Sequence, residues 1–465
     1  MPELLFHGAA GEVTGSMHMV QVDGRWAALD CGLFQGRREA SEQKNREWPL
    51  PPSQIAAVVL SHAHIDHSGR LPRLVRDGYD GPIFCTPATR DLCALMLPDS
   101  AHIQEEDVFY VNKRRRKKGL PPVEELYNYK DALAAVERMQ SISYKRWFEV
   151  VPGLLARYNE AGHMLGSAGV ELTFGKRNGH APTLYFSGDI GRPGKPILRD
   201  PAPLPACDTL ICESTYGARV NESIDQAREK LIEVVKRTYA RGGKVIVPAF
   251  SVGRTQTIVY YLHEAMLAGE VPRYPIFVDS PLAVNATEVF KMHPECYDAE
   301  ARSLNRVTGD ILGGGCCTYV RDVEDSKALH EKQGPFSIIA ASGMCEAGRI
   351  RHHIKHNVAD PRCTILIVGY QAADTLGRRL ADGAKEVTLF HETFPVRAEV
   401  VQIHGFSAHA DQADLLRMLT PLAGGTQKAF LVHGELEQSN VLAGSLRERG
   451  FAHVAIARRG ERLPV

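Results

Sequence analysis

Residues 56–69 read AAVVLSHAHIDHSG, an apolar run followed by four side chains that can bind a metal ion. The apolar part is short, so we expect it to form a buried strand over residues 55–60. Four potential ligands within six positions are too many to be explained by packing or solvation alone. They are His62, His64, Asp66 and His67. This stretch therefore predicts a metal centre at the end of a strand.

The spacing of these four ligands predicts two adjacent ions. In an extended segment, residues two apart point the same way, so His62 and His64 can reach one ion together. Asp66 and His67 lie beyond the strand end, in the turn into a helix expected over residues 68–75, and they can reach a second ion. Imidazole and carboxylate are ligand types that suit zinc.

One segment cannot complete two catalytic sites, so we expect further ligands at other strand ends. His163 lies in the small-residue loop AGHMLGS (residues 161–167), just before an expected strand. Asp189 follows the expected strand at residues 183–186, where its carboxylate can bridge two ions. Gly-Asp is also common turn chemistry. Ligation by Asp189 is therefore preferred only because the first ligand cluster is present.

The length and charge of the chain limit the possibilities. With 465 residues, it suggests two domains, or one domain with a long insertion. Lys plus Arg and Asp plus Glu each number 55, so the overall charge gives no sign of a nucleic-acid binder. A polyanionic substrate would have to be attracted locally, by metal ions and a few basic side chains. The run KRRRKK at residues 113–118 is either a solvated surface run or a phosphate-contacting patch.

The cysteines and the N-terminus favour a cytoplasmic location. None of the ten cysteines forms a C-x-x-C pair, which favours reduced, buried thiols over a disulfide framework or a zinc ribbon. The N-terminus, MPELLFHGAAGEVTGS, lacks the basic region and apolar run of a signal peptide. No stretch has the apolar length of a membrane span, so we expect no membrane partner.

The rhythm of the elements divides the chain into three segments. Short β-rich runs precede Asp208, and after it strands alternate with long helices, as in a parallel doubly wound sheet. We therefore expect one domain at residues 1–207, an inserted α/β domain at 208–393 and a return to the first domain at 394–465. The expected strands are 17–22, 26–29, 169–174, 183–186, 209–212, 244–247, 275–278 and 337–341, with helices at 223–240 and 255–268.

The order of these features resembles the metallo-β-lactamase superfamily: H-x-H-x-D-H, a histidine in a small-residue loop, then a strand-ending aspartate. Asp30 in LDCG (residues 29–32) matches the first motif of that family. The resemblance implies an αββα sandwich. It also implies that Asp30 orients a ligating histidine and is not itself a ligand.

Three later segments resemble the motifs of the β-CASP branch of the superfamily, whose members are RNA- and DNA-processing nucleases. They are CESTYG (residues 212–217), FSAHAD (406–411) and FLVHGE (430–435). Segments 248–254, 279–281 and 342–344 are similar to the domain inserted in that branch. The expected fold class is therefore α/β, a metallo-β-lactamase αββα sandwich with an inserted doubly wound β-CASP domain.

The resemblance implies seven ligands for two zinc ions per chain. The ligands of one ion are His62, His64 and His163. Those of the other are Asp66, His67 and His433. Asp189 would bridge the two ions. Water bound to zinc has a pKa of about 7, so it would supply hydroxide for attack on a phosphodiester.

The catalytic residues implied are Asp66, Glu213, His409 and Asp30. Glu213 would pair with His409, and His409 would act as a general acid near the leaving oxygen. From its local sequence alone, Glu213 is better explained as a helix-capping or surface acid. His409 is likewise compatible with a satisfied histidine near a helix start.

His433 is the reason to expect RNA as the substrate. The RNA-acting members that this sequence resembles carry His at this position, and the DNA-acting members carry Val. We therefore expect a zinc-dependent ribonuclease acting on single-stranded RNA, with a cleft between the domains that limits access to single strands. A DNA nuclease of the same branch and a thioesterase-type or lactamase-type hydrolase remain alternatives. Endonucleolytic or 5′-exonucleolytic cutting and homodimer formation are left open.

The inserted domain is expected to contact the substrate. Its candidate residues are Ser251, Arg254, Ser342 and Gly343. Gly253 and Arg254 before a helix can cradle a phosphate, or can simply begin that helix. Three histidines of the same domain are expected to be surface residues, because the metal site is already full. They are His352, His353 and His356.

Overall fold

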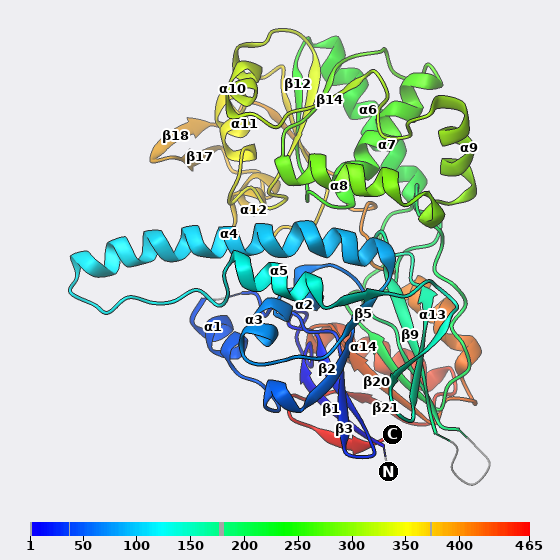
Figure 1. Ribbon diagram of the computed structural model, residues 1–465. Coiled ribbons are helices and arrows are strands. Elements are labelled where there is room, and N and C mark those ends of the chain that lie inside the picture. The colour runs from blue at the N-terminus through cyan, green and yellow to red at the C-terminus, as the bar shows by residue number, and fades with distance from the viewer. Residues whose placement is uncertain (1, 37, 176–180, 373) are drawn as a thin grey trace. The chain divides into compact units, whose positions relative to one another are not determined.

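The computed structural model describes residues 2–36, 38–175, 181–372 and 374–465, which form two compact units (Figure 1). The first unit comprises Met1–Pro193, Asp200–Val220 and Ala408–Val465. The second comprises Gly194–Arg199 and Asn221–Ser407.

The first unit contains two seven-stranded sheets. The strands of one sheet are β1 (Glu3–Gly8), β2 (Met17–Val22), β3 (Arg25–Leu29), β4 (Ile55–Val59), β5 (Ile83–Cys85), β6 (Met139–Ser141) and β22 (Arg462–Pro464). The strands of the other are β7 (Trp147–Val151), β8 (Leu154–Glu160), β9 (Ala168–Phe174), β10 (Thr183–Phe186), β11 (Thr209–Glu213), β20 (Lys428–Val432) and β21 (Val454–Ile456). Their orders are β22-β1-β2-β3-β4-β5-β6 and β21-β20-β11-β10-β9-β8-β7.

The two sheets bury a common apolar core between them. In β4, Ala57 and Val59 point into this core, where they meet Leu172 and Phe186 of the second sheet. Val58, between them in the sequence, is also fully buried but is not part of that cluster. This alternation is the period-2 pattern of a strand covered on both faces, and it explains why β4 is a continuous apolar run.

Helices cover the outer faces of the two sheets and complete the expected αββα sandwich. They are α1 (Arg38–Arg46), α2 (Ile65–Ser68), α3 (Leu71–Arg76), α4 (Pro87–Lys117), α5 (Tyr129–Glu137), α13 (Gln412–Leu419) and α14 (Leu436–Glu448). Figure 1 shows α1–α5 grouped beside β1–β5. Leu415 of α13 and Leu442 of α14 pack on Leu210 and Leu431 of the other sheet.

The second unit is built on a six-stranded parallel sheet of order β14-β13-β15-β12-β16-β19. Its strands are β12 (Lys244–Pro248), β13 (Ile276–Val278), β14 (Cys317–Tyr319), β15 (Phe336–Ala340), β16 (Thr364–Ile367) and β19 (Glu399–Gln402), with a hairpin of β17 (Glu386–Leu389) and β18 (Glu392–Pro395). Its helices are α6 (Ile224–Ala240), α7 (Arg254–Leu267), α8 (Pro281–Met292), α9 (Ala299–Thr308), α10 (Val323–Glu331), α11 (Ile350–Asn357) and α12 (Leu376–Ala381). The expected inserted doubly wound domain has this architecture.

The limits of the two units differ from the expected boundaries at residues 208 and 393. Strand β11, expected to open the insertion, instead pairs with β10 and β20 in the first unit. Strand β19, expected to follow the insertion, pairs with β16 in the second unit. The local sequence of a buried apolar strand does not indicate which sheet the strand joins. It therefore does not fix the boundary between the two domains.

One of the three histidines expected at the surface is buried. His353 of α11 has a relative exposure of 0%, and its Nε2 lies 2.6 Å from Asp279 Oδ2. His352 and His356 are exposed. A side chain one position along a helix points about 100° away, so neighbours in a histidine cluster can have opposite environments.

The cysteines and the helices bear on the location of the protein. All ten cysteines are free thiols. Among the helices of the described segments, none combines the length and the apolar character needed to cross a bilayer.

Candidate metal centre

Five candidate residues follow the carboxyl ends of parallel strands in the first unit. Asp30 follows β3 and His62 follows β4, and these strands are parallel neighbours. In the other sheet, Asp189 follows β10, Glu213 ends β11 and His433 follows β20, and these three strands are also parallel. Since parallel strands end at the same edge, the topology gathers these side chains.

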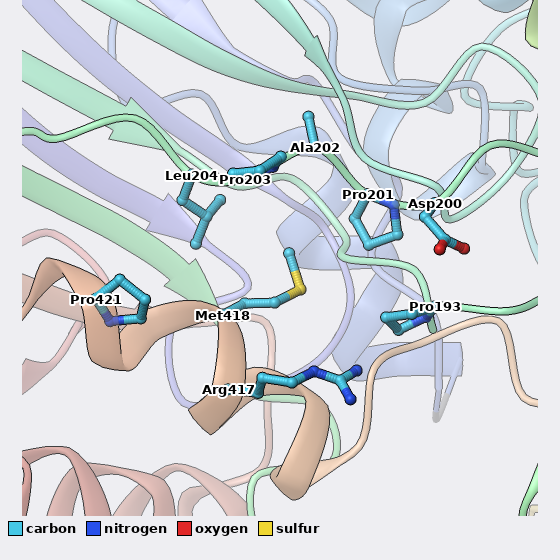
Figure 2. A pocket seen from close by; sticks show the side chains of 9 residues that line it. All are labelled: Pro193, Asp200, Pro201, Ala202, Pro203, Leu204, Arg417, Met418 and Pro421. Atoms are coloured by element: carbon cyan, nitrogen blue, oxygen red, sulfur yellow. The ribbon is translucent and has the colours of Figure 1, made fainter.

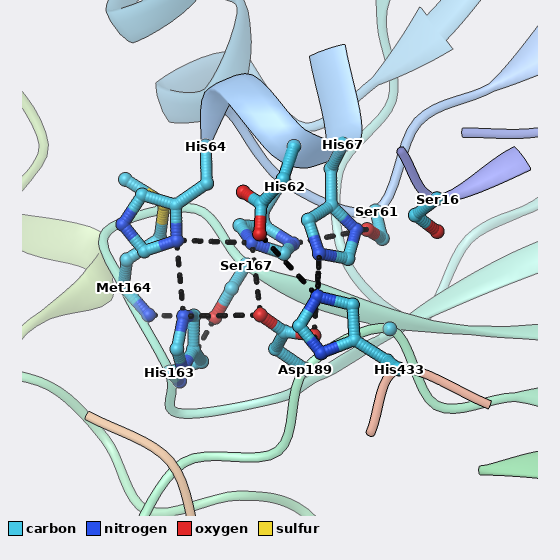
Figure 3. A network of polar contacts seen from close by, with 12 residues as sticks. Ser16, Ser61, His62, His64, His67, His163, Met164, Ser167, Asp189 and His433 are labelled. Carbon is cyan, nitrogen blue, oxygen red and sulfur yellow. Dashed lines mark hydrogen bonds and ion pairs between the residues drawn. The ribbon is translucent and has the colours of Figure 1, made fainter. Parts of the chain in front are cut away.

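The first ligand set consists of three histidines and one carboxylate whose ligand atoms lie within 4.8 Å of one another. His64 Nδ1 is 3.2 Å from His62 Nε2 and 3.1 Å from His163 Nε2. Asp189 Oδ2 lies 3.5 Å from Nε2 of both His62 and His163. Figure 3 shows these ring nitrogens converging on one point.

The second ligand set lies beside the first. His67 Nε2 is 3.1 Å from His433 Nε2, which is 3.4 Å from Asp66 Oδ2. Asp66 and His67 belong to the single-turn helix α2, not to a turn that precedes a helix. Asp189 Oδ1 lies 3.3 Å from His67 Nε2.

Asp189 faces both ligand sets, with Oδ2 directed at the first and Oδ1 at the second. Its side chain is 1% exposed, and within the described part of the chain Oδ1 accepts no hydrogen bond. Burial opposes charge on this carboxyl, but His433 and His67 outweigh that effect and hold its pKa well below the ordinary value. A buried anionic oxygen with no donor, surrounded by imidazole nitrogens, fits a bridging metal ligand.

The histidines of the first set are in the protonation state that a metal requires. Burial, together with the neighbouring His62, lowers the pKa of His64 to about 3. Burial also holds the pKa of His163 well below its ordinary value. Both rings are therefore neutral at pH 7, and neutral imidazole is the ligating form.

Hydrogen bonds at Nδ1 direct three other imidazoles so that Nε2 faces the centre. His67 Nδ1 lies 2.7 Å from Asp30 Oδ2, and His62 Nδ1 lies 3.0 Å from Ser61 Oγ. His433 Nδ1 lies 3.0 Å from Thr215 Oγ1. A proton on each Nδ1 leaves the Nε2 lone pair free for a metal.

Asp30 accepts hydrogen bonds from two segments beside the metal centre, one just before β2 and one just after β4. Its Oδ1 accepts from Ser61 N at 2.7 Å, and its Oδ2 accepts from Ser16 Oγ at 3.1 Å and Ser61 Oγ at 3.0 Å. Asp30 and His433 both leave their strands with positive φ, 63° and 50°. The left-handed conformation costs roughly 1–2 kcal/mol per residue, so packing around the site must hold these two residues in place.

The His163 loop is fixed by hydroxyl groups. Ser167 Oγ accepts from His163 N at 3.0 Å and from Met164 N at 3.1 Å. At the start of α4, the hydroxyls of Thr86 and Thr89 both donate to Gly166 O, at 2.7 and 2.9 Å. Helix α4 therefore begins against the loop that positions a metal ligand.

Glu213 and His409 lie together beside the ligand sets. His409 Nδ1 is 3.0 Å from Glu213 Oε2, and its ring centroid is 4.5 Å from that of His163. Burial disfavours the imidazolium, but the carboxylates of Glu213 and Asp189 outweigh burial and raise the pKa of His409 to about 10. With its side chain 20% exposed, His409 is a cationic proton donor that a substrate can reach.

Thr215 links this pair to the second ligand set. Its hydroxyl donates to Glu213 Oε2 at 2.6 Å, and it faces His433 Nδ1 at 3.0 Å. One hydroxyl can donate one hydrogen while accepting another. Thr215 thus holds Glu213 toward His409 and also fixes the tautomer of His433.

The four candidate substrate residues lie in the second unit. Ser251 and Arg254 follow β12, and Ser342 and Gly343 follow β15. These strands are parallel neighbours, so all four residues lie at one edge of the sheet. A Cβ placed on Gly343 would lie 3.2 Å from the ring of Phe250, an aromatic side chain that is 51% exposed.

A cavity of about 340 Å³ elsewhere in the first unit offers no comparable chemistry (Figure 2). Four of its nine lining residues are prolines, three more are Ala202, Leu204 and Met418, and its charged residues are Asp200 and Arg417. Arg417 already pairs with Asp414 at 2.8 Å. The metal centre is therefore the candidate functional site.

Sequence comparison agrees with the fold and the site. Residues 10–86 match the metallo-beta-lactamase superfamily, residues 255–380 match the Beta-Casp domain, and residues 393–457 match the Zn-dependent metallo-hydrolase RNA specificity domain. The chain is 36% identical over 458 residues to Ribonuclease TTHA0252 of Thermus thermophilus, covering 98% of this chain and 99% of that protein. It is 32% identical over 440 residues to Transcription termination factor FttA of Methanocaldococcus jannaschii, covering 92% of this chain and 66% of that protein.

The fold also has a match among solved structures. A protein of unknown function from Enterococcus faecalis V583 covers 100% of both chains with a TM-score of 0.56 and 12% sequence identity, which shows a shared fold alone. The family assignment therefore rests on the sequence relatives. The chain belongs to the β-CASP branch of the metallo-β-lactamase superfamily, as its motifs indicate. It is a metal-dependent hydrolase.

Sequence reasoning missed the hydroxyl groups that orient the ligands. Ser61 directly precedes His62, Ser167 lies four residues after His163, and Thr215 lies two residues after Glu213. Each lies inside a segment that was recognised for its histidine or carboxylate, and this position is the only signal that could have selected it. Serine and threonine are common in turns, so their presence alone does not indicate a site.

Proposed function

We propose that this protein is a ribonuclease that hydrolyses phosphodiester bonds of single-stranded RNA and holds two zinc ions per chain. The observation that carries the proposal is the Glu213–His409 pair, with His409 Nδ1 at 3.0 Å from Glu213, beside two adjacent ligand sets. The relative of nearly equal length is named a ribonuclease, and the C-terminal match is to an RNA specificity domain, which supports the same assignment.

The donor chemistry supports zinc at both sets. His62, His64 and His163 would hold one ion, and Asp66, His67 and His433 would hold the other. Asp189 would bridge them through its two oxygens. Bound zinc lowers the pKa of water to about 7, and a pair of ions roughly 3.5–4 Å apart offsets charge on an attacked phosphodiester.

The residues around the metals have separate tasks in this proposal. Asp30 and Thr215 hold His67 and His433 with Nε2 toward the centre. Glu213 keeps His409 charged and oriented, so that the ring can deliver a proton to the departing sugar oxygen. Such a placed general acid contributes about 10²–10⁴-fold to a rate.

The need for a proton donor separates a phosphodiesterase from a thioesterase on the same metals. A thiol has a pKa near 8.5, so a thiolate departs without protonation. An alkoxide resembles hydroxide, whose conjugate acid has a pKa of about 15.7, and it departs poorly without a proton. The buried Glu213, committed to His409, therefore favours a substrate with an alkoxide leaving group.

The second unit would contact the chain flanking the scissile bond. Ser251, Arg254, Ser342 and Gly343 lie at the carboxyl edge of its parallel sheet, the edge where α/β sheets bind ligands. Phe250 and Tyr370 are 51% and 55% exposed and also follow strands at this edge. Unpaired bases stack on such rings, which supports a single-stranded substrate.

The cellular setting follows from the cysteines. Eight of the ten free thiols are buried, and burial raises the pKa of Cys85 well above its ordinary value, so these groups are inert. Free thiols are typical of a reducing compartment. We therefore place the enzyme in the cytoplasm.

The choice of RNA is tested at His433. Wild-type protein is expected to cut single-stranded RNA in preference to DNA of the same sequence. His433→Val removes one of three ligands from the second set, so it should lower zinc content by about one ion per chain and slow RNA cleavage at least about 100-fold. Elemental analysis and cleavage of end-labelled strands measure both effects.

His453→Val is the matched control, because His453 is exposed and belongs to neither ligand set. It should retain both zinc and activity. Equal cleavage of DNA and RNA by the wild-type protein under matched conditions would overturn the choice of RNA in favour of a DNA nuclease.

A further inference from the structure

The far end of α4 carries the most concentrated charge in the chain. Lys113 to Lys118 are six consecutive basic residues in a protein whose formal net charge is +0. Helix α4 begins against the metal-centre loop at Thr86 and ends at Lys117. At about 1.5 Å per residue, Lys113 lies roughly 40 Å along the helix from that loop. We call residues 109–118 the basic arm.

These basic side chains are not used to hold the fold together. Lys113, Arg114, Arg116, Lys117 and Lys118 are exposed. Across the described part of the chain, no residue from 113 to 118 forms an ion pair with a carboxylate. Arg115 differs from the other five basic residues, because its Nε donates a hydrogen bond to Pro121 O at 2.6 Å. The other five cations therefore face solvent.

Two aromatic rings lie exposed just before the cations. Phe109 is 65% exposed and Tyr110 is 59% exposed, and their centroids are 5.6 Å apart. Helical spacing places Phe109 on one face with Lys113 and Tyr110 on the adjacent face with Arg114. Each ring is therefore followed, one turn later, by a cation on the same face.

We propose that the basic arm is a second binding site for single-stranded RNA, remote from the metal centre. The cations would contact successive phosphates, and the two rings would stack on unpaired bases, the combination used by proteins that bind single strands. This inference rests on the proposed ribonuclease function. The arm would bind the part of the RNA that flanks the cleaved bond, and it would not contact the cleaved bond itself.

Charge favours RNA over a second copy of this chain. A symmetric contact through the arm would set six cations against six like charges, which is unfavourable. A membrane surface is also disfavoured, because an interfacial helix needs its apolar side chains on one face. Of the exposed large apolar residues of α4, Ile103 and Tyr110 share a face, but Phe109 points about 100° away from Tyr110. The exposed acidic side chains of Glu106 and Asp107 lie between Ile103 and Tyr110 on the shared face, so no continuous apolar face is formed.

Helix α4 begins at the metal-centre loop and carries the basic arm at its far end. The contribution of the arm to RNA binding should therefore depend on the length of the RNA. A stacked strand rises about 3.4 Å per nucleotide, so it needs roughly 12 nucleotides to span 40 Å. RNA of about 8 nucleotides should occupy the metal centre alone, and RNA of about 40 nucleotides should reach both sites. The arm should therefore affect binding of long RNA and leave turnover of short RNA unchanged.

The test compares two variants that each remove four positive charges from the full-length protein. The arm variant carries Lys113→Gln, Arg114→Gln, Arg116→Gln and Lys117→Gln. The control variant carries Lys130→Gln, Arg146→Gln, Arg449→Gln and Arg458→Gln, at positions that are also exposed. Fluorescence anisotropy gives Kd against salt for the long RNA, with His409→Ala added to every protein so that cutting is slow and the metals stay bound. The value of kcat/KM on the short RNA is measured without that change.

The arm variant should bind the long RNA at least about tenfold more weakly, with a log–log salt slope reduced by about 0.7 for each lost phosphate contact. The control variant should behave like wild type, and both variants should cleave the short RNA at the wild-type rate. A further variant, Phe109→Ala with Tyr110→Ala, should weaken long-RNA binding about tenfold with little change in the salt slope.

Wild-type affinity of the arm variant for long RNA would overturn the proposal, even if its binding to anionic vesicles or its self-association changed. Binding and cutting are read separately, so the two hypotheses fail in different ways. Absence of RNA cleavage by the wild-type protein contradicts the proposed ribonuclease. RNA cleavage by the wild-type protein, together with unchanged long-RNA affinity in the arm variant, contradicts the basic arm alone.

Discussion

His64→Ala should lower the zinc content from about two ions per chain to about one and slow RNA cleavage at least about 10³-fold. His64 Nδ1 lies within 3.2 Å of both other histidines of its set, so its loss removes the central donor. Without the ion, the pKa of water returns from about 7 toward 15.7, and attack by hydroxide is lost at neutral pH. Elemental analysis and initial rates measure the two effects.

His453→Ala is the matched control for this prediction, since His453 is exposed and outside the ligand sets. It should change neither zinc content nor rate. The two-zinc assignment fails if elemental analysis of the wild-type protein finds no zinc, or one magnesium ion. Reactivation by manganese would be compatible with it, because nitrogen and oxygen ligands also accept that ion.

His409→Ala should slow RNA cleavage by about 10²–10⁴-fold while leaving zinc content intact. His409 belongs to none of the ligand sets, and its Nδ1 is committed to Glu213. The expected loss is therefore one of proton donation and not of metal. If zinc were lost from this variant, the roles given to His409 and His433 would have to be exchanged.

A substrate with a good leaving group separates proton donation from a structural effect. A nucleotide p-nitrophenyl phosphodiester releases a phenolate that departs without a proton, so His409→Ala should slow its hydrolysis far less than that of RNA. Glu213→Gln should show the same pattern more weakly, because the uncharged amide still accepts from Thr215 but no longer favours the imidazolium. An equal loss on both substrates would contradict the role of general acid.

The metal centre could be predicted from the sequence because its ligands obey simple geometric rules. His62 and His64 have the two-residue spacing of an extended chain, and Asp189 and His433 lie within three residues of the ends of buried apolar strands. Parallel strands end at one edge, so residues separated by hundreds of positions meet there. The pairing of Glu213 with His409 came from the family resemblance, since either residue alone has an ordinary local sequence.

Other features depend on tertiary contacts that a local pattern does not contain. Strands β11 and β19 are apolar runs like their neighbours, and only hydrogen-bonded pairing assigns them to their sheets. His353 was expected at the surface, but a buried Asp279 on another element pairs with it. The hydroxyl of Thr215 is functional only because Glu213 and His433 both lie within 3.0 Å of it.

The most direct test of the account is incubation of the purified protein with end-labelled single-stranded RNA and DNA, with and without chelator. The account predicts that RNA is cut in preference to DNA, that chelator stops the reaction, and that added zinc restores it. No cleavage of RNA by the zinc-loaded protein, together with turnover of a thioester or a lactam, would contradict it and assign this metal centre to a small-molecule hydrolase.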